Sequence, residues 1–440
     1  MTGPTRIQLD QHTARRGRLM QAMGPDGIAI IPSAREVIRA RDTHYRFRQD
    51  SDFRYLTGFP EPDSIAVLAP GRPEGEYVLF VRPRDAAMEI WNGRRAGLEG
   101  AKKQFRADQT FVIGDFDKEL PKLIANRARV HYTLGEHPEL DHKITACVKE
   151  TRELSRRGPS APSEFLSLDA SLHEMRLHKT PAEIEIIKKA CAISAQAHVR
   201  AMQYTSPGLW EYEVMAEIHH EFEQHGMEPG YGSIVGGGDN ACILHYVENN
   251  AVLKSGDLLL IDAGGELNGY TADITRTFPV GGKFSPAQKA VYEVVLAAQK
   301  AATVELVVGN STDAPHKVAT RVLTEGMVEL GLLKGPAAAR IKDESYKRFF
   351  MHGTGHWLGL DVHDVGRYKL DNKYRPFAAG MVMTVEPGIY IAPGSEGVDK
   401  KFWGIGIRIE DDVLVTAKGP QVLTSGVPKE VKEIEALMRG

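Results

Sequence analysis

One short pattern occurs twice in the chain, and this internal repeat is the strongest constraint on its fold. The stretches Gly256–Gly264 and Gly380–Gly388 each hold a glycine, an apolar run, a carboxylate six residues after that glycine, and another glycine two residues later. The two carboxylates are Asp262 and Glu386. An apolar run bounded by glycine indicates a buried strand. We therefore expect two related halves, each with an acid at the end of a strand.

Each copy of the pattern is followed by a second strand pattern with an acid of its own. Asp273, in YTADITRTF, follows Asn268–Gly269, a dipeptide typical of a hairpin turn. Glu410 lies in GIGIRIEDDVLVT, and both acids are expected inside these strands. Helical patterns come next, at Gln288–Glu305 and Lys429–Met438. The repeat predicts a C-terminal α/β domain in which a pseudo-twofold axis brings four carboxylates together.

The stretch His352–Gly366, HGTGHWLGLDVHDVG, concentrates three histidines and two aspartates among glycines. Glycine lets other groups approach the backbone closely, and imidazole binds metals and carries protons near neutral pH. Apolar neighbours such as Trp357 and Leu360 indicate a half-buried segment. A polar turn with structural histidines is the alternative for any single histidine. Together with the acids, the stretch indicates a functional site.

Four carboxylates and an imidazole suit two divalent cations with bridging carboxylates. A carboxylate within a buried strand is costly unless it is paired or metal-bound. For any one acid, a strand end bonded to backbone is an equally good interpretation. Oxygen-rich ligation without thiolate favours Mn²⁺, and Co²⁺ or Zn²⁺ would also fit. The zinc helix H-E-x-x-H is excluded here because Gly353 follows His352.

Size and composition predict a globular protein of two or three domains. The chain has 440 residues, of which 42% are hydrophobic and 26% charged, as is ordinary for soluble proteins. A net charge of -3 and the lack of a polybasic run argue against nucleic acid and membranes as partners. We expect a cytoplasmic location, because no signal-like or membrane-spanning apolar run is found. The odd, scattered Cys147, Cys191 and Cys242 are expected to be reduced.

The first third of the chain predicts an α/β domain with a mixed sheet over residues 1–155. Charged helical stretches alternate there with five short apolar runs that read as strands, namely Ile28–Ile31, Ile65–Leu68, Tyr77–Val81, Phe111–Ile113 and Val130–Leu134. Between the first two runs, Arg46–Ser64 is expected to be a packed loop. Trp91 is either an interior residue of this domain or an aromatic offered to a neighbouring subunit.

A Ser-, Pro- and Gly-rich stretch at Ser155–Ser163 indicates a boundary, so residues 156–175 are expected to be a linker. Residues 176–440 would then form the catalytic domain. Its first helix should start at Thr180, because Thr180, Pro181 and Glu183 form a capping-box pattern. Further helices are expected at Trp210–His225, from Ser285 to about Glu305, and at Asp313–Leu330.

The chain is similar to the pita-bread metallopeptidases, and within them it resembles the aminopeptidase P (Xaa-Pro aminopeptidase) family. The matching stretches are QDSDFRYLTGF, DAGGELNGYTADITRTF, HGTGHWLGLDVHDVG, TVEPGIYI and GIRIEDDVLVT, which span nearly the whole chain. The resemblance implies an N-terminal α/β domain, a pita-bread catalytic domain, and a homodimer or homotetramer. Arg54 departs from the family, where an aromatic is common at this position. The motifs separate aminopeptidase P less clearly from prolidase.

The resemblance also implies which residues bind the metals. Asp273 and Glu410 would each serve both metals, and His356 would bind one of them. The full set of implied ligands is Asp262, Asp273, His356, Glu386 and Glu410. All five residue types are in place, which argues against the metal-free branches of the fold.

Further residues are assigned to the substrate pocket by the same resemblance. His245 matches a histidine near the substrate amine and leaving group, and His363 one near the scissile carbonyl. His352 would line the pocket. Arg408 would order the groups behind the ligands, and Tyr390 would join that network.

The implied reaction is hydrolysis of the bond between a free N-terminal residue and a following proline. In the family a hydroxide that bridges the metals attacks the carbonyl, so no serine or cysteine nucleophile is needed. Glu386 would take a proton, and His363 or His245 would stabilise the tetrahedral oxygen or protonate the proline nitrogen. Two alternatives remain open, namely a prolidase that cleaves only Xaa-Pro dipeptides and a non-enzymatic binding module on the same fold.

Overall fold

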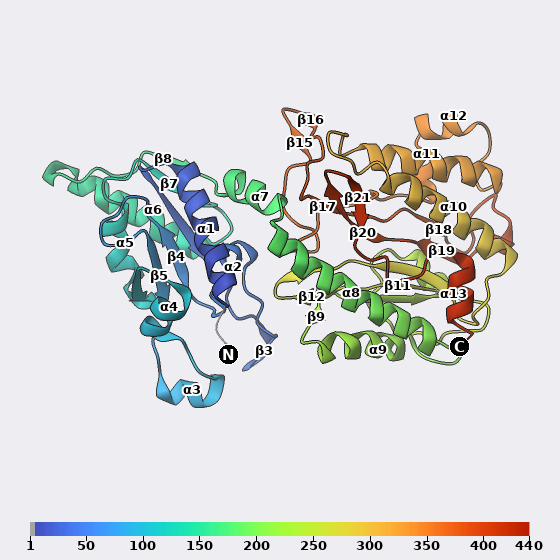
Figure 1. Ribbon diagram of the computed structural model, residues 1–440, viewed down its shortest axis with the longest axis horizontal. Helices are drawn as coiled ribbons and strands as arrows, with labels where there is room; N and C mark the ends of the chain where they lie inside the picture. Colours follow the sequence, from blue (N-terminus) through green and yellow to red (C-terminus); the bar gives the residue numbers. More distant parts are fainter. Residues whose placement is uncertain (1–4, 440) are drawn as a thin grey trace. The chain divides into compact units, whose positions relative to one another are not determined.

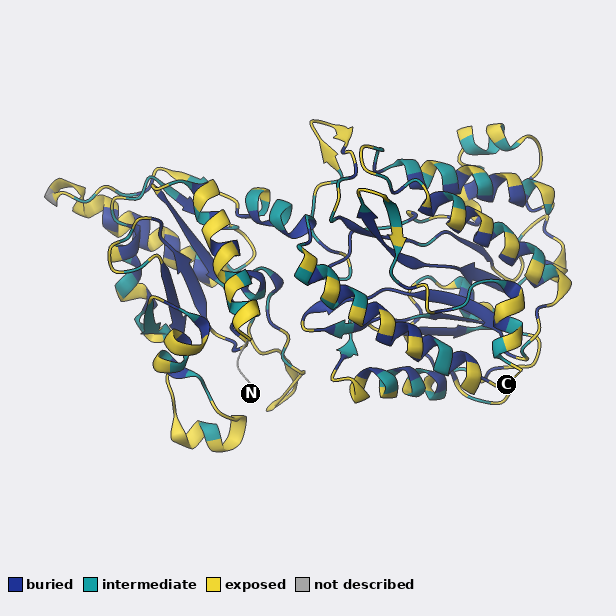
Figure 2. Ribbon diagram, in the orientation of Figure 1, coloured by how far each residue is buried: buried dark blue, intermediate teal, exposed yellow. Residues whose placement is uncertain are grey.

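The computed structural model describes residues 5–439. The chain forms two compact units, Met1–His173 and Glu174–Gly440 (Figure 1). Each is described by itself below. Buried residues line the strands of both units, whereas the helices expose one face (Figure 2). Among the described residues, no helix combines the length and the apolar character that crossing a membrane would need.

The N-terminal unit is built on a six-stranded mixed sheet, as predicted. Its strands lie in the order β6-β5-β4-β1-β7-β8, and β4 runs antiparallel to both neighbours while the other pairs are parallel. The strands are β1 (Gly27–Pro32), β4 (Ile65–Leu68), β5 (Tyr77–Val81), β6 (Gln109–Val112), β7 (Arg129–His131) and β8 (Glu164–Leu166). Strand β8 falls within the segment that was expected to be a linker, and it pairs with β7.

Helices cover both faces of this sheet (Figure 1). One face packs against α5 and α6 through a core that includes Ile30, Val67, Phe80 and Phe116. The remaining elements of the unit are α1 (Arg6–Met23), β2 (Ile38–Ala40), β3 (Thr43–His44), α2 (Ser51–Thr57), α3 (Ala86–Asn92), α4 (Gly97–Phe105), η1 (Ile113–Asp115), α5 (Phe116–Ile124), α6 (Pro138–Glu153) and η2 (Leu154–Arg157). Helix α7 (Asp169–Leu177) runs across the division between the units.

The expectation of a loop at Arg46–Ser64 was wrong, because α2 lies inside it. The Asp50 side chain accepts the amide of Phe53 at the start of this helix, and Gly58 ends it in the left-handed conformation. Gly58 also allows a close approach, since a Cβ atom there would meet the ring of His12. Helix α2 is short, and its cap and stop signals were both present in the sequence.

The C-terminal unit contains the two predicted halves. In the first half β11 pairs antiparallel with β14, and in the second β17 pairs antiparallel with β20. The first half comprises α8 (Pro181–Tyr204), α9 (Glu211–Gln224), β9 (Glu228–Pro229), β10 (Ile234–Gly237), η3 (Gly238–Cys242), β11 (Leu258–Asp262), β12 (Gly265–Leu267), β13 (Tyr270–Thr271), β14 (Thr275–Pro279) and α10 (Pro286–Thr303). The hairpin predicted at Asn268–Gly269 joins β12 to β13.

The second half repeats the antiparallel strand pair of the first half, with longer connecting segments. Its elements are α11 (Ala314–Glu329), α12 (Ala337–Lys342), η4 (Ser345–Arg348), β15 (Lys369–Leu370), β16 (Lys373–Tyr374), β17 (Val382–Val385), β18 (Gly388–Ile391), η5 (Lys400–Phe402), β19 (Ile405–Arg408), β20 (Asp411–Thr416), β21 (Gly419–Val422) and α13 (Val431–Leu437). The capping box predicted at Thr180 is present, and Ser285, where a helix was expected to start, also forms a capping box. Local signals therefore started the long helices at the expected places.

A buried ionic cluster ties the two halves together. Arg276 on β14 and Asp411 on β20 are fully buried and form an ion pair of 2.7 Å. Asp411 also accepts hydrogen bonds from Lys429, Gln299 and Thr424. A buried charge that loses its partner is strongly destabilising. The docking of the halves therefore depends on Asp411 as well as on apolar packing.

We predict that Asp411→Ala lowers the free energy of unfolding by about 3–5 kcal/mol, because it leaves Arg276 buried without its carboxylate. Urea denaturation of the metal-free chain measures this change. The matched control is Glu430→Ala, which removes the exposed ion pair with Lys300 and should cost about 0–1 kcal/mol. Equal, small effects of the two substitutions would contradict the prediction.

The N-terminal unit should lose stability in acid through His12. Its Nδ1 donates to the Tyr55 carbonyl oxygen at 3.0 Å, and burial lowers the pKa of His12 to about 4 from 6.5. Between pH 6.5 and about 4, His12 is therefore protonated in the unfolded chain but neutral in the folded chain. This contribution is complete above pH 6.5 and is lost progressively as the pH falls toward 4. As the pH is lowered over this range, the urea concentration at the unfolding midpoint should fall less steeply for His12→Gln than for the wild type. Parallel pH dependences of the two proteins would refute this role of His12.

Candidate metal centre

The five predicted ligands meet in the C-terminal unit, although they come from five separate segments. Asp262 ends β11, Glu386 directly follows β17, and His356 lies in the glycine-rich segment before β15. Asp273 and Glu410 precede β14 and β20. The His356 Nε2 atom lies 3.3 Å from an Asp273 carboxylate oxygen and 3.7 Å from one of Glu386. Ligand atoms of Asp273, His356 and Glu410 all lie within 4.8 Å of one another.

Asp273 and Glu410 do not lie inside strands, which corrects the sequence-based expectation. Each occupies a break just before its strand, so its amide is free to bond across the pseudo-twofold axis. The Asp273 amide donates to the Asp412 carboxylate at 2.9 Å, and the Glu410 amide donates to the Thr275 carbonyl at 3.0 Å. Regular strand positions would place these amides in the ladder instead. Because of these breaks, the carboxylates of Asp273 and Glu410 can lie close to each other.

The carboxylates of the site carry more negative charge than the nearby cationic side chains, Arg408 and His356, balance. Burial, with the charges of Asp273, Glu386 and Asp262, raises the pKa of Glu410 well above its usual value. Burial also raises the pKa of Glu386 to about 7 and that of Asp262 above its usual range. Such shifts mean that the ionised acids lack positive partners. Oxygen donors, a single imidazole and this charge deficit fit divalent cations.

His356, together with Arg408, supplies positive charge to the site when no metal is bound. Burial alone would lower its pKa, but the hydrogen bond and charge of Asp273, with the charge of Glu386, raise it to about 9. In turn His356 holds the pKa of Asp273 below its usual value despite burial. A bound cation would replace this proton, because metals bind neutral imidazole. Glycine at position 355 lets the backbone next to His356 lie close to the Thr384 backbone, since a Cβ atom there would overlap the Thr384 carbonyl.

Arg408 and Tyr390 form the network that the sequence suggested. Arg408 donates to Asp262 at 2.6 Å and to the Tyr390 hydroxyl at 3.0 Å. The Tyr390 hydroxyl lies 2.8 Å from His352 Nε2, and His352 Nδ1 lies 2.7 Å from the Gly353 carbonyl. The carbonyl can only accept, so Nδ1 carries the proton and Nε2 accepts from Tyr390. Burial and Arg408 lower the pKa of His352 to about 4, which keeps the ring neutral.

His245 and His363 lie on the exposed side of the centre. The ring of His363 packs edge-on against that of His356, with centroids 4.3 Å apart. Burial is the main cause that lowers the pKa values of His352 and His363, and the charge of His245 adds to it in both cases. The three histidines that were predicted to line the pocket therefore lie near the predicted ligands.

Tyr231 is a site residue that the sequence analysis missed. Its hydroxyl lies 2.7 Å from one oxygen of Asp262 and 2.5 Å from one of Asp273. It therefore holds two predicted ligands side by side. Tyr231 lies in PGYGS, a stretch with no periodicity and no acid or histidine, so nothing local marked it.

Helix α8 forms hydrogen bonds with Asp412 and with the ligand loop, which is the segment from Asp262 to Asp273. The Cys191 thiol donates to Asp412 at 3.3 Å, and the Gly265 amide donates to the Ser194 hydroxyl at 3.0 Å. His198 Nε2 donates to the Ala263 carbonyl at 2.9 Å. The sequence analysis assigned these polar residues no part in the site, because their hydrogen-bond partners lie far away in the sequence.

Comparison with known proteins identifies the family. The model of metallopeptidase family M24 matches residues 185–417, and that of the aminopeptidase P N-terminal domain matches residues 12–132. The Xaa-Pro aminopeptidases of Escherichia coli (strain K12) and Haemophilus influenzae are 43% and 45% identical to this chain, over 98% of each chain. The structure of Pseudomonas aeruginosa aminopeptidase PepP is 51% identical, with a TM-score of 0.97 over 100% of this chain and 99% of that one.

These similarities extend over both units and separate the alternatives. The relatives are Xaa-Pro aminopeptidases, which favours that activity over a prolidase or a non-enzymatic module. The pita-bread fold predicted for the C-terminal unit is likewise confirmed. The chain belongs to metallopeptidase family M24 and, within it, to the Xaa-Pro aminopeptidases of the aminopeptidase P type.

Proposed function

We propose that this Xaa-Pro aminopeptidase works with two divalent cations, most simply Mn²⁺. The ligands would be Asp262, Asp273, His356, Glu386 and Glu410, with Asp273 and Glu410 shared between the two ions. The observation that carries this proposal is the convergence of four acids, two buried and two half-buried, with one imidazole and without enough positive charge. The oxygen-rich donor set favours Mn²⁺, while Co²⁺ or Zn²⁺ would also fit. A related structure is described as Zn-substituted E. coli aminopeptidase P with product.

The chain's own residues would then divide the work of hydrolysis. When bound, the cations would lower the pKa of a water molecule and polarise the peptide carbonyl. Glu386 is proposed to accept the proton of the attacking water, because its carboxylate lies among the proposed ligands, 3.7 Å from His356 Nε2. His363 or His245 would stabilise the oxygen of the tetrahedral intermediate or protonate the proline nitrogen. Both lie on the open side of the centre.

Arg408 and Tyr390 are proposed to position the reacting groups rather than to react. Arg408 binds Asp262 and Tyr390 at once, so it links a ligand to the neutral His352. Because both ring nitrogens of His352 are bonded, to Tyr390 and to the Gly353 carbonyl, the ring would be held in one tautomer and one orientation beside the substrate. Tyr231 would set the spacing of Asp262 and Asp273 on the other side. Groups that orient ligands in this way commonly tune metal affinity.

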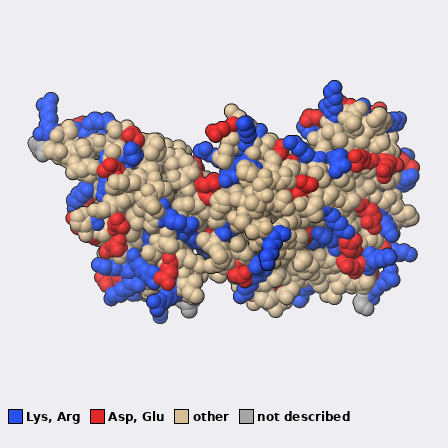
Figure 3. Space-filling model, turned by 45° about the horizontal axis from the view of Figure 1, so that its top comes forward, with Lys and Arg blue, Asp and Glu red and all other residues tan. Residues whose placement is uncertain are grey.

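We also propose a homodimer or homotetramer in the cytoplasm. Trp91 is 83% exposed on α3, which rules out the interior alternative and is consistent with an aromatic offered to a neighbouring subunit. A cytoplasmic location is supported by three free cysteines. Basic and acidic side chains are interspersed on the face in Figure 3.

Removal of the metal is predicted to abolish cleavage of the tripeptide Arg-Pro-Pro, and Mn²⁺ is predicted to restore it. The reason is that no serine or cysteine nucleophile replaces the metal-activated water. Product analysis after dialysis against chelator, then after adding Mn²⁺, measures both steps. The dipeptide Arg-Pro is the comparison substrate. If Arg-Pro-Pro is cleaved equally well after chelator treatment, the metal mechanism is wrong. If only the dipeptide Arg-Pro is cleaved, the protein is a prolidase.

Tyr231→Phe is predicted to weaken Mn²⁺ binding by about 10–100-fold, because Asp262 and Asp273 lose the hydroxyl that holds them together. Calorimetric titration of the metal-free chain with Mn²⁺ measures this change. Tyr212→Phe, an exposed position on α9, is the matched control and should bind like the wild type. An unchanged affinity in Tyr231→Phe would rule out this role.

A further inference from the structure

A cavity of about 330 Å³ lies in the N-terminal unit, whereas the metal centre is built by the C-terminal unit. It sits at the carboxyl end of β1, which ends at Pro32, and beyond the end of β6, where Ile113 follows. These two strands run in the same direction. Ligands of α/β sheets bind at the carboxyl ends of such strands. The position therefore marks the cavity as a candidate binding site, and none of the residues proposed for the peptidase reaction lines it.

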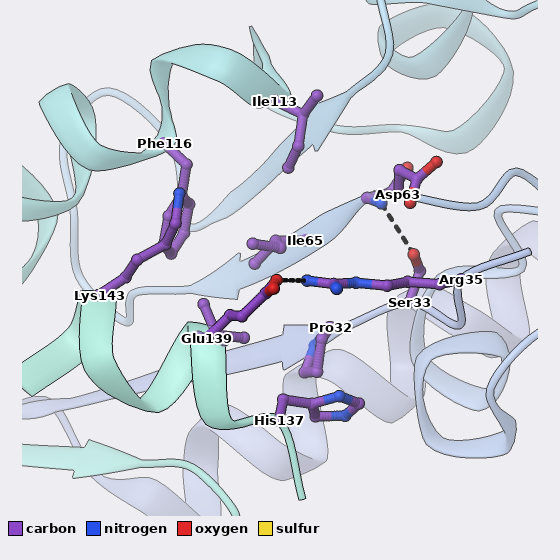
Figure 4. A pocket seen from close by; sticks show the side chains of 12 residues that line it. Pro32, Ser33, Arg35, Asp63, Ile65, Ile113, Phe116, His137, Glu139 and Lys143 are labelled. Carbon is purple, nitrogen blue, oxygen red and sulfur yellow. Dashed lines mark hydrogen bonds and ion pairs between the residues drawn. The ribbon is translucent and has the colours of Figure 1, made fainter.

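The wall of the cavity is mainly apolar. Ile65, Ile113 and Phe116 surround the space in Figure 4, with Pro32 below them. Leu140 from the first turn of α6 completes this surface. Ligand pockets are typically apolar with a few polar groups, and their volumes begin near 300 Å³. The cavity thus has the size and lining for a small molecule with an apolar body.

Charges of both signs stand at the rim of the same cavity. Arg35 and Glu139 form an ion pair of 2.7 Å that runs between Ile65 and Pro32 in the view of Figure 4. Their side chains are 63% and 74% exposed, so the pair contributes little by itself and can open. Asp63 adds a negative charge, and Lys143, whose ammonium group also pairs with the exposed Asp117 at 2.9 Å, adds a positive one. A ligand that carries one positive and one negative group would complement this rim.

We propose that this cavity binds a free amino acid with an apolar side chain, in its zwitterionic form. Arg35 and Lys143 receive the carboxylate, Glu139 and Asp63 receive the ammonium group, and the side chain rests on the apolar wall. The α6 terminus beside the rim has no side-chain cap, which adds positive potential for the carboxylate. A free amino acid is also the class of molecule that an Xaa-Pro aminopeptidase releases.

Calorimetric titration of the metal-loaded full chain with leucine tests the proposal. We expect saturable binding with a dissociation constant of about 1 mM or tighter. Arg35→Gln should weaken it by about tenfold or more, because the carboxylate loses its charged partner. The matched control Arg39→Gln, exposed on β2 and outside the cavity, should leave it unchanged. Cleavage of Arg-Pro-Pro should be the same in all three proteins.

Two analogues and a second variant complete the test. Leucinamide and N-acetylleucine each lack one charge and should bind at least about tenfold more weakly than leucine. Ile113→Trp fills the cavity and should abolish binding; if that variant fails to fold, Arg35→Gln decides. The proposal is overturned if no saturable binding occurs, or if binding survives both substitutions. N-acetylleucine binding as tightly as leucine would also overturn it, because the ligand would then be a simple carboxylic acid.

Discussion

Repulsion among four neighbouring carboxylates, two buried and two half-buried, is the constraint on which the C-terminal unit depends. Two like charges about 4 Å apart repel by about 4 kcal/mol at an effective dielectric constant near 20. Burial makes the ionised forms costlier still, and the raised pKa values of Glu386 and Glu410 reflect both effects. The fold tolerates this arrangement through His356 and Arg408, and divalent cations would relieve it further. Metal binding and the stability of this region should therefore be coupled.

The two halves of the unit build the centre jointly. The amide of Asp273 reaches a carboxylate of the second half, and the amide of Glu410 reaches a carbonyl of the first half. The Arg276–Asp411 pair then fastens β14 to β20 directly beside these exchanges. Neither half holds all the ligands. A duplicated fold of this kind creates its site only when the copies dock, which makes the buried ionic cluster part of the functional design.

Much of both units was predictable from the residues, and the reason is local chemistry. Apolar runs predicted β1, β4 and β5, while the cap residues Thr180 and Ser285 predicted where two long helices start. The repeat predicted two halves, and the family resemblance, which the comparisons confirm, named the ligand residues that the structure brings together. By contrast, the strand breaks at Asp273 and Glu410 were not predicted, because their amides bond to residues far away in sequence.

What the sequence determined by itself was the set of acids associated with the repeated strands, the histidine-rich segment and the order of the elements. These follow from patterns within a dozen residues, where side-chain periodicity and capping act. Only the tertiary structure decided that Tyr231 bridges two acids, that His198 and Ser194 brace the ligand loop, and that Trp91 is exposed. Each of these depends on which distant segments meet, and that is set by packing of the whole unit rather than by any local preference.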